Sequence, residues 1–185
     1  MMISIKLIGL FFVVLLLSSC ASLSKDECLN ADWFDIGFND GQSGYRLTRL
    51  SNHNEACAEY HIKANGQRYA QGREQGLKKY CTLDNALQEG LSGKRYRGVC
   101  PNEIEHRFIK EHRKGMAIYE LQKEVDQHQR RITSLRNTLD SDKNKEKLSA
   151  NKIERYEHEL LELRVKTEEK QKRLYYMKGQ ADISM

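Results

Sequence analysis

Proline is almost absent from this sequence, in which Pro101 is the only one among 185 residues. Between Glu103 and Lys178 there is no proline, and Gly115 is the only glycine. Proline and glycine are the residues that most disfavour a helix interior, so nothing in this stretch prevents long helices. The composition therefore changes at Pro101.

A large excess of charge of one sign is also missing. Charged residues make up 31% of the chain, but the formal net charge is only +5 and the two signs are interspersed. Such a balance gives no indication of nucleic-acid binding, and we expect no nucleic-acid partner. The charged fraction and a mean hydropathy of -0.74 indicate that the chain beyond its first residues is soluble.

No hydrophobic run is long enough for a comfortable membrane span, which needs about 20 apolar residues. The longest run, Leu7 to Leu17, follows Lys6 and ends in small residues, as secretory signals do. Its ending, Leu17-Ser18-Ser19-Cys20, resembles the bacterial lipobox, in which a diacylglycerol is attached to the cysteine and the signal is cleaved just before it. The resemblance implies lipid on Cys20; ordinary signal cleavage and an uncleaved anchor are the alternatives.

The residues after Cys20 bear on location. Residue 21 is Ala, whereas Asp at this place retains lipoproteins in the inner membrane of enteric bacteria. The resemblance therefore implies the periplasmic face of the outer membrane. Residues 20–27 are expected to form a tether, which would reach at most about 25 to 30 Å when extended.

Cysteine pairs with the close spacing of zinc ligands are absent, so we expect no metal site. With Cys20 used for lipid, four cysteines remain, and an even number in an exported chain indicates disulfides. Three connectivities are possible. We favour the connectivity with two short loops, in which Cys28 is bonded to Cys57 and Cys81 to Cys100.

Glycines and aromatic residues recur at helical spacing between residues 28 and 101. Glycine within a helix costs about 1 kcal/mol relative to alanine, so several on one face need a reason. Close approach of another helix is that reason, and we expect soluble helices packed through their glycine faces. Short strands joined by turns at Asn39-Asp40-Gly41 and Asn65-Gly66 are the alternative. The glycine series are Gly37, Gly41 and Gly44 after Trp33, then Gly72 and Gly76 after Tyr69, then Gly90, Gly93 and Gly98.

This order of residues, with Tyr80-Cys81 and Gly98-Val99-Cys100, resembles an uncharacterised group of Gram-negative lipoproteins known only as a domain of unknown function. The resemblance covers roughly residues 20–120. It implies a lipobox, a glycine and cysteine module and often a charged helical tail. It carries no catalytic or binding residue to this chain.

Beyond Pro101, apolar residues recur in heptads that keep one frame from Ile118 to Met177. The seam positions hold Asp142, Glu146 and Ser149 in the middle, which indicates an interruption. We favour a helical hairpin that turns near residues 140–148, because each arm then buries the apolar stripe of the other. One long helix with a weak middle is the alternative, and the continuous frame supports it.

Motifs that would carry chemistry are incomplete. Gly41-Gln42-Ser43-Gly44 and Gly90-Leu91-Ser92-Gly93 place the second glycine one residue too early for a nucleophile elbow. His106 and His112 do not share a helix face, so we expect surface histidines. We therefore predict no catalytic residues, no cofactor and no enzyme activity.

The predicted fold is all-α, a small disulfide-stapled and glycine-packed helical domain followed by a helical hairpin or coiled coil. The predicted function is that of a non-enzymatic envelope lipoprotein acting through protein contacts, with envelope partners or self-association through residues 118–177. A binding module for cell-wall glycan or lipid head groups is the alternative. The expected segments are a signal peptide at 1–19, the tether at 20–27, the domain at 28–101, the hairpin at 102–178 and a disordered tail at 179–185. The candidate contact residues are Trp33, Tyr69, Arg95, Tyr96 and Arg97, with Tyr45 as a further stacking surface in the alternative.

Overall fold

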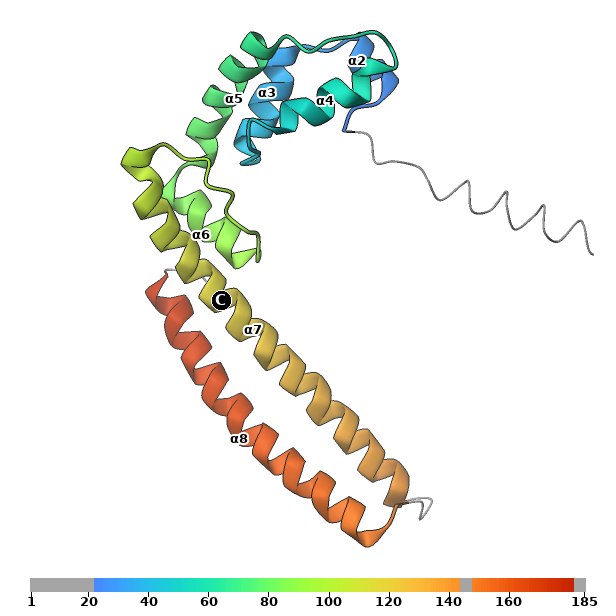
Figure 1. Cartoon of the computed structure of the whole chain (residues 1–185). Helices are drawn as coiled ribbons and strands as arrows, with labels where there is room; N and C mark the ends of the chain where they lie inside the picture. The colour runs from blue at the N-terminus through green and yellow to red at the C-terminus, as the bar shows by residue number, and fades with distance from the viewer. Residues whose placement is uncertain (1–21, 144–147, 182–185) are drawn as a thin grey trace, which may run out of the picture. The chain divides into compact units, whose positions relative to one another are not determined.

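The computed structural model describes residues 22–143 and 148–181 (Figure 1). Within them the chain forms α-helices and no strands, as the sequence predicted. The predicted signal peptide, Cys20 and residues 182–185 lie outside the described residues. The helices are α2 (Lys25–Leu29), α3 (Trp33–Gln42), α4 (Arg49–Ala58), α5 (Gly66–Tyr80), α6 (Leu83–Leu91), α7 (Asn102–Lys143) and α8 (Ala150–Gln180).

The chain divides into two compact units, which meet between Lys79 and Tyr80. This division falls within the predicted domain 28–101 rather than at its end, because the start of α7 packs against α6 in the second unit. Residues 22–27, which we expected to belong to a tether, include the start of α2. Ser24 caps α2 through a reciprocal pair of hydrogen bonds with Glu27, so this segment is folded. Gly179 and Gln180 are helical rather than part of a tail.

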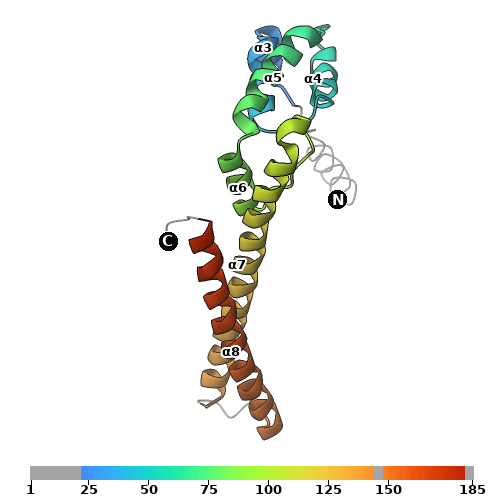
Figure 2. The same cartoon turned by 90° about the vertical axis from the view of Figure 1, so that its left-hand side faces the viewer.

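In the first unit, α3 and α5 lie side by side with their glycine faces in contact (Figure 2). A Cβ atom added to Gly37 would lie 2.1 Å from the carbonyl oxygen of Tyr69, and one added to Gly72 would lie 1.9 Å from that of Phe34. Any side chain would force the two backbones apart. The expected close packing through glycines is confirmed, and the strand alternative is wrong.

The second unit repeats this device between α6 and α7. A Cβ atom added to Gly90 would lie 2.2 Å from the carbonyl oxygen of His112. Gly93 follows α6 with a φ of +69°, in the left-handed region that favours glycine, and the ring of Tyr119 lies directly against it. The start of α7 is thereby held against α6 and the loop that follows it.

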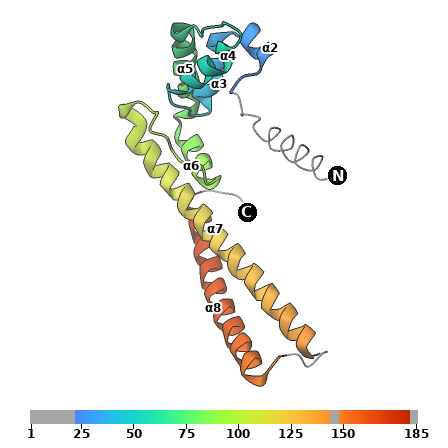
Figure 3. The ribbon, with the colours of Figure 1, turned by 45° about the vertical axis from the view of Figure 1, so that its right-hand side comes forward.

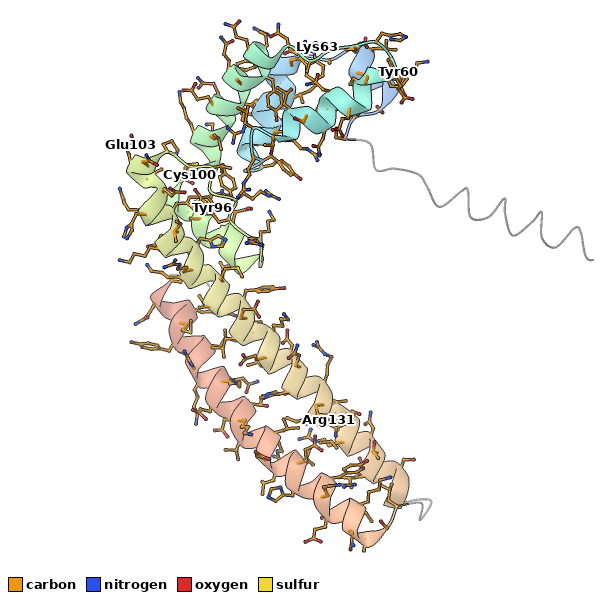
Figure 4. All side chains as sticks on the ribbon, viewed as in Figure 1. Tyr60, Lys63, Tyr96, Cys100, Glu103 and Arg131 are labelled. Carbon is orange, nitrogen blue, oxygen red and sulfur yellow. A yellow bond between two sulfur atoms is a disulfide. The ribbon has the colours of Figure 1, made fainter. Side chains whose placement is uncertain are left out.

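Helices α7 and α8 form an antiparallel hairpin, the arrangement favoured from the sequence (Figures 1 and 3). Arg131 of α7 points toward α8 and donates two hydrogen bonds to the carboxylate of Glu159, at 2.7 and 2.9 Å (Figure 4). Lys170 pairs with Glu124 at 2.5 Å. The buried seam of α7 consists of the predicted heptad residues Ile118, Leu121, Val125, Ile132, Leu135 and Leu139, and Leu174 of α8 is buried with them.

Two disulfides close the loops that the sequence favoured. Cys28 is bonded to Cys57 in the first unit, and Cys81 to Cys100 in the second. All four cysteines are buried. Each bridge stays within one unit: the first joins α2 to α4, and the second joins Cys81, just after α5, to Cys100, just before α7.

Candidate functional site

The structure does not place Tyr69, a predicted contact residue, on the surface. Its side chain is 0% exposed, so it cannot stack on a ligand. Its hydroxyl donates a hydrogen bond of 2.6 Å to Asp40 Oδ2. The ring lies in a T-shaped arrangement against His53, with 5.9 Å between the ring centroids. Tyr69 is therefore part of the core of the first unit.

Asp40, His53 and Ser22 form a hydrogen-bonded chain in the same unit. His53 Nε2 lies 2.8 Å from Asp40 Oδ2, and His53 Nδ1 lies 2.9 Å from Ser22 Oγ. Burial raises the pKa of the Asp40 carboxyl, but the hydrogen bonds from His53 and Tyr69 outweigh burial and lower this pKa overall. The carboxylate thus links α3 to α4 and α5, and the residues before α2 are attached to them through Ser22.

A serine, a histidine and an aspartate in this order also occur in serine hydrolases. Here, however, His53 and Asp40 are buried, at 2% and 9% exposed, and Asp40 Oδ2 also accepts a hydrogen bond from Tyr69 of α5. The arrangement is better suited to holding helices together than to acyl transfer.

Tyr96 also has a structural role, which replaces its predicted role in ligand contact. Its hydroxyl accepts hydrogen bonds from the backbone N–H of Val99, at 3.1 Å, and of Cys100, at 2.9 Å. Its ring packs against that of Phe108, with 4.8 Å between the ring centroids. His112, expected on the surface, is buried beside these rings, and its Nε2 lies 2.7 Å from the carbonyl oxygen of Lys94.

The remaining predicted contact residues are not gathered in one place. Trp33 and Tyr45 are half-buried in the first unit, where Arg49 lies over the ring of Tyr45. Arg95 is exposed and Arg97 half-buried in the loop of the second unit. A shared binding site of aromatic rings and arginines is therefore not assembled within either unit.

The sequence analysis missed a second apolar surface, which lies on α8. Thr167 and Leu174 face α7 and are 4% and 7% exposed. Other large apolar side chains of α8 lie outside the heptad frame and are more than half exposed. We call them the outer face of α8; they are Leu161 at 63%, Val165 at 61%, Tyr175 at 62% and Tyr176 at 64%.

A helix with apolar residues on two opposite sides has more apolar surface than its hairpin partner can cover. Isolated exposed apolar residues are ordinary, but a row of them along one helix marks a contact surface. The signal was present in the sequence, since Leu161 and Val165 are four residues apart and so share a face. These residues lie outside the heptad positions from which the buried seam was predicted, so they were not considered as a second surface.

Most of the glycine contacts of both units fall within the part of the chain that matches one family model. Residues 32–117 match the model of the family described as a protein of unknown function, DUF2799. The DUF2799 match begins at the N-cap residue of α3 and ends two residues after Gly115, so it includes the close helix–helix contacts of glycines in both units, while Tyr119, which lies against Gly93, is outside it. The outer face of α8 lies beyond it.

No curated protein and no solved structure matches this chain. Within the described residues, none of the helices combines the length and the apolar character that crossing a membrane requires. The same residues contain no group of three or more His, Cys, Asp or Glu side chains placed to hold a metal ion.

Proposed function

We propose that this protein is a non-enzymatic lipoprotein of the cell envelope that acts through contacts with other proteins. Lipid on Cys20 would hold it on the periplasmic face of the outer membrane. The proposal of export and lipid attachment rests on the lipobox-like residues 17–20 and on the two disulfides, which form and persist in oxidising compartments.

The observation that carries the proposal of protein contacts is the outer face of α8. Leu161, Val165 and Tyr176 are each more than 60% exposed. These side chains gain little burial from the hairpin, so they do not contribute to its core. A partner that covers them would gain the free energy of removing this apolar surface from water.

The hairpin covers the heptad seam on α7, although Leu160 and Leu163 on the α8 side of the seam are only half-buried. Leu121 and Ile132 are buried between α7 and α8. The contact region proposed from the sequence, residues 118–177, is therefore narrowed to the solvent side of α8.

The alternative function, binding of cell-wall glycan or lipid head groups, loses support from the same structure. It relied on four aromatic rings as stacking surfaces. Tyr69 is buried and the Tyr96 hydroxyl is engaged with the backbone of Val99 and Cys100. Trp33 and Tyr45 belong to the first unit and Arg95 and Arg97 to the second, so neither unit offers the full set of rings and arginines.

The hydrogen bond between Ser22 and His53 limits how far the first unit can lie from a lipid on Cys20. If Cys20 carries lipid, only Ala21 separates it from Ser22, whose hydroxyl is bonded to His53. Two residues span about 7 Å, so the first unit would lie directly at the membrane surface. Replacement of Cys20 by Ser should move the protein to the soluble fraction of disrupted cells, and a variant that stays in membranes would contradict lipid anchoring.

Photo-crosslinking in intact cells tests the contact surface. A photoreactive phenylalanine derivative is placed at Val165, and in a control at Gln127, which is exposed on α7. The proposal predicts a discrete crosslinked protein product from position 165 and none from position 127. Equal labelling at both positions would contradict a specific contact at α8.

A further inference from the structure

The second unit contains a groove of about 880 Å³ beside the start of α7 and the end of α8. Its apolar surface includes Ile109 of α7 and Met177 of α8. All the ionisable side chains that line it are basic: His106, Lys110, Arg113 and Lys114. Lys114 pairs with Glu111, which is not among the lining residues.

The groove continues the helix–helix seam of the hairpin. Helix α8 ends at Gln180, where Met177 and Ala181 pack against the cluster that contains Ile118. Helix α7 extends further, to Asn102, without α8 beside it. Lys114 lies seven residues before Leu121, so it occupies the same seam position one heptad earlier. An apolar groove along one side of α7 suits another helix. Its basic side chains favour a helix that carries carboxylates.

The outer face of α8 has this composition. Leu161 and Val165 form its apolar centre, and carboxylates lie on the same side of the helix, at steps of three, four or seven residues from one of them. These carboxylates are Glu154, Glu157, Glu168 and Glu169, all exposed. Only Glu168 has an ion-pair partner among the described residues, Lys172 on the next turn.

We propose that the occupant of the groove is the outer face of α8 from a second copy of this chain. The inference rests on the proposed function and identifies the partner in it. The apolar residues Leu161 and Val165 would enter the groove over Ile109 and Met177. The glutamates beside them would pair with Lys110 and Arg113, which have no ion-pair partner among the described residues.

Such a contact joins two different surfaces, so each copy has one of each. Contacts of this kind close into a ring or continue as a chain of copies, rather than stopping at a symmetric dimer. Copies anchored in one membrane meet at a high effective concentration, which allows a modest interface to be occupied.

The test uses two full-length copies with different epitope tags in the same cells. The donor copy carries the photoreactive residue at Val165, and the acceptor copy is unmodified. We expect a crosslinked product that contains both tags, with the attachment point mapped by mass spectrometry to residues 106–117 of the acceptor. Attachment to α8 of the acceptor would overturn the proposal in favour of a symmetric contact.

Charge reversal then tests the pairing. Lys110→Glu with Arg113→Glu in the acceptor should lower the yield of the doubly tagged product about tenfold. Lys123→Glu with Arg136→Glu, an equal charge change at exposed positions of α7 outside the groove, should leave it unchanged. Glu157→Lys with Glu169→Lys in the donor should restore the yield with the reversed acceptor. Equal loss in the control, or no restoration, would overturn the proposal.

The failure of this inference can be distinguished from failure of the proposed function. Crosslinks from Val165 only to a different protein would overturn self-association and leave function through protein contacts standing. No product above that from Gln127 would overturn both.

Discussion

Gly90 of α6 and Gly115 of α7 face each other across the helix contact of the second unit. A Cβ atom added to Gly90 would lie 3.0 Å from the Cα atom of Gly115, and one added to Gly115 would lie 2.9 Å from the carbonyl carbon of Gly90. The two backbones therefore touch with no side chain between them. Gly41 and Gly76 have the same relationship in the first unit, where a Cβ atom on Gly76 would lie 3.0 Å from the Cα atom of Gly41.

Gly90→Ala is expected to destabilise the second unit by about 1 to 3 kcal/mol. The methyl group would meet the carbonyl oxygen of His112 at 2.2 Å, and backbone atoms on both sides leave it no room. The gain in helix propensity, about 1 kcal/mol, is smaller than this cost. Chemical denaturation followed by circular dichroism measures the difference.

Gly179→Ala is the matched control for this substitution. Gly179 is also helical, but nothing lies within 4 Å of a Cβ atom added there. The same change should therefore leave stability unchanged or raise it by up to about 1 kcal/mol. If Gly90→Ala and Gly179→Ala had equal effects, close packing would not be the reason for the glycine at position 90.

The lowered pKa of Asp40 predicts acid sensitivity of the first unit. A carboxyl whose pKa is lower in the folded state than in the unfolded state stabilises the fold above the unfolded value of about 3.9. This contribution is lost as the pH falls through the pKa of Asp40 in the folded state, which is lower than that of an ordinary aspartate. Thermal unfolding between pH 6 and pH 2.5 should show a steeper loss for the wild type than for Asp40→Asn. Parallel curves would contradict an ionised Asp40 in the folded unit.

The Cys81–Cys100 disulfide should stabilise the second unit by about 3 kcal/mol, since it closes a loop between residues 19 apart. Cys81→Ser with Cys100→Ser removes it without leaving an unpaired thiol. We expect the midpoint of chemical denaturation to fall for this variant under oxidising conditions and to match the wild type under reducing conditions. An unchanged midpoint under oxidising conditions would mean that the bridge does not contribute to stability.

Regular spacing allowed much of the fold to be predicted. The heptads from Ile118 to Leu139 specified the buried face of α7, and the glycine steps after Trp33 and Tyr69 indicated close helix contacts. The turn of the hairpin was harder to predict, because the heptad frame continues across it. Helix α7 nevertheless ends at Lys143 and α8 begins at Ala150, around the polar residues that interrupt the seam.

Contacts between distant residues were not predictable from local patterns. Asp40 meets His53 and Tyr69, which are 13 and 29 residues away, and only the packing of α3 with α4 and α5 brings them together. For the same reason the sequence predicts Tyr69 and Tyr96 as contact rings, whereas the structure buries Tyr69 and half-buries Tyr96. The periodicity of an aromatic residue indicates its helix face, but it does not tell which side another helix will cover.

We propose that the outer face of α8 contributes to contacts with other proteins and not to the stability of the fold. Its most direct test uses a double variant, Leu161→Gln and Val165→Thr in the same chain. This outer-face variant is compared with Leu135→Ala, a single substitution in the buried seam. Thermal unfolding and crosslinking in cells, from a photoreactive residue at Tyr176, are measured on the same proteins.

The outer-face variant should unfold within about 0.5 kcal/mol of the wild type and lose the crosslinked product. Leu135→Ala should cost about 2 to 5 kcal/mol, because it leaves a cavity between the helices. An outer-face variant that is destabilised as much as Leu135→Ala, or that keeps its crosslinked product, would contradict the account.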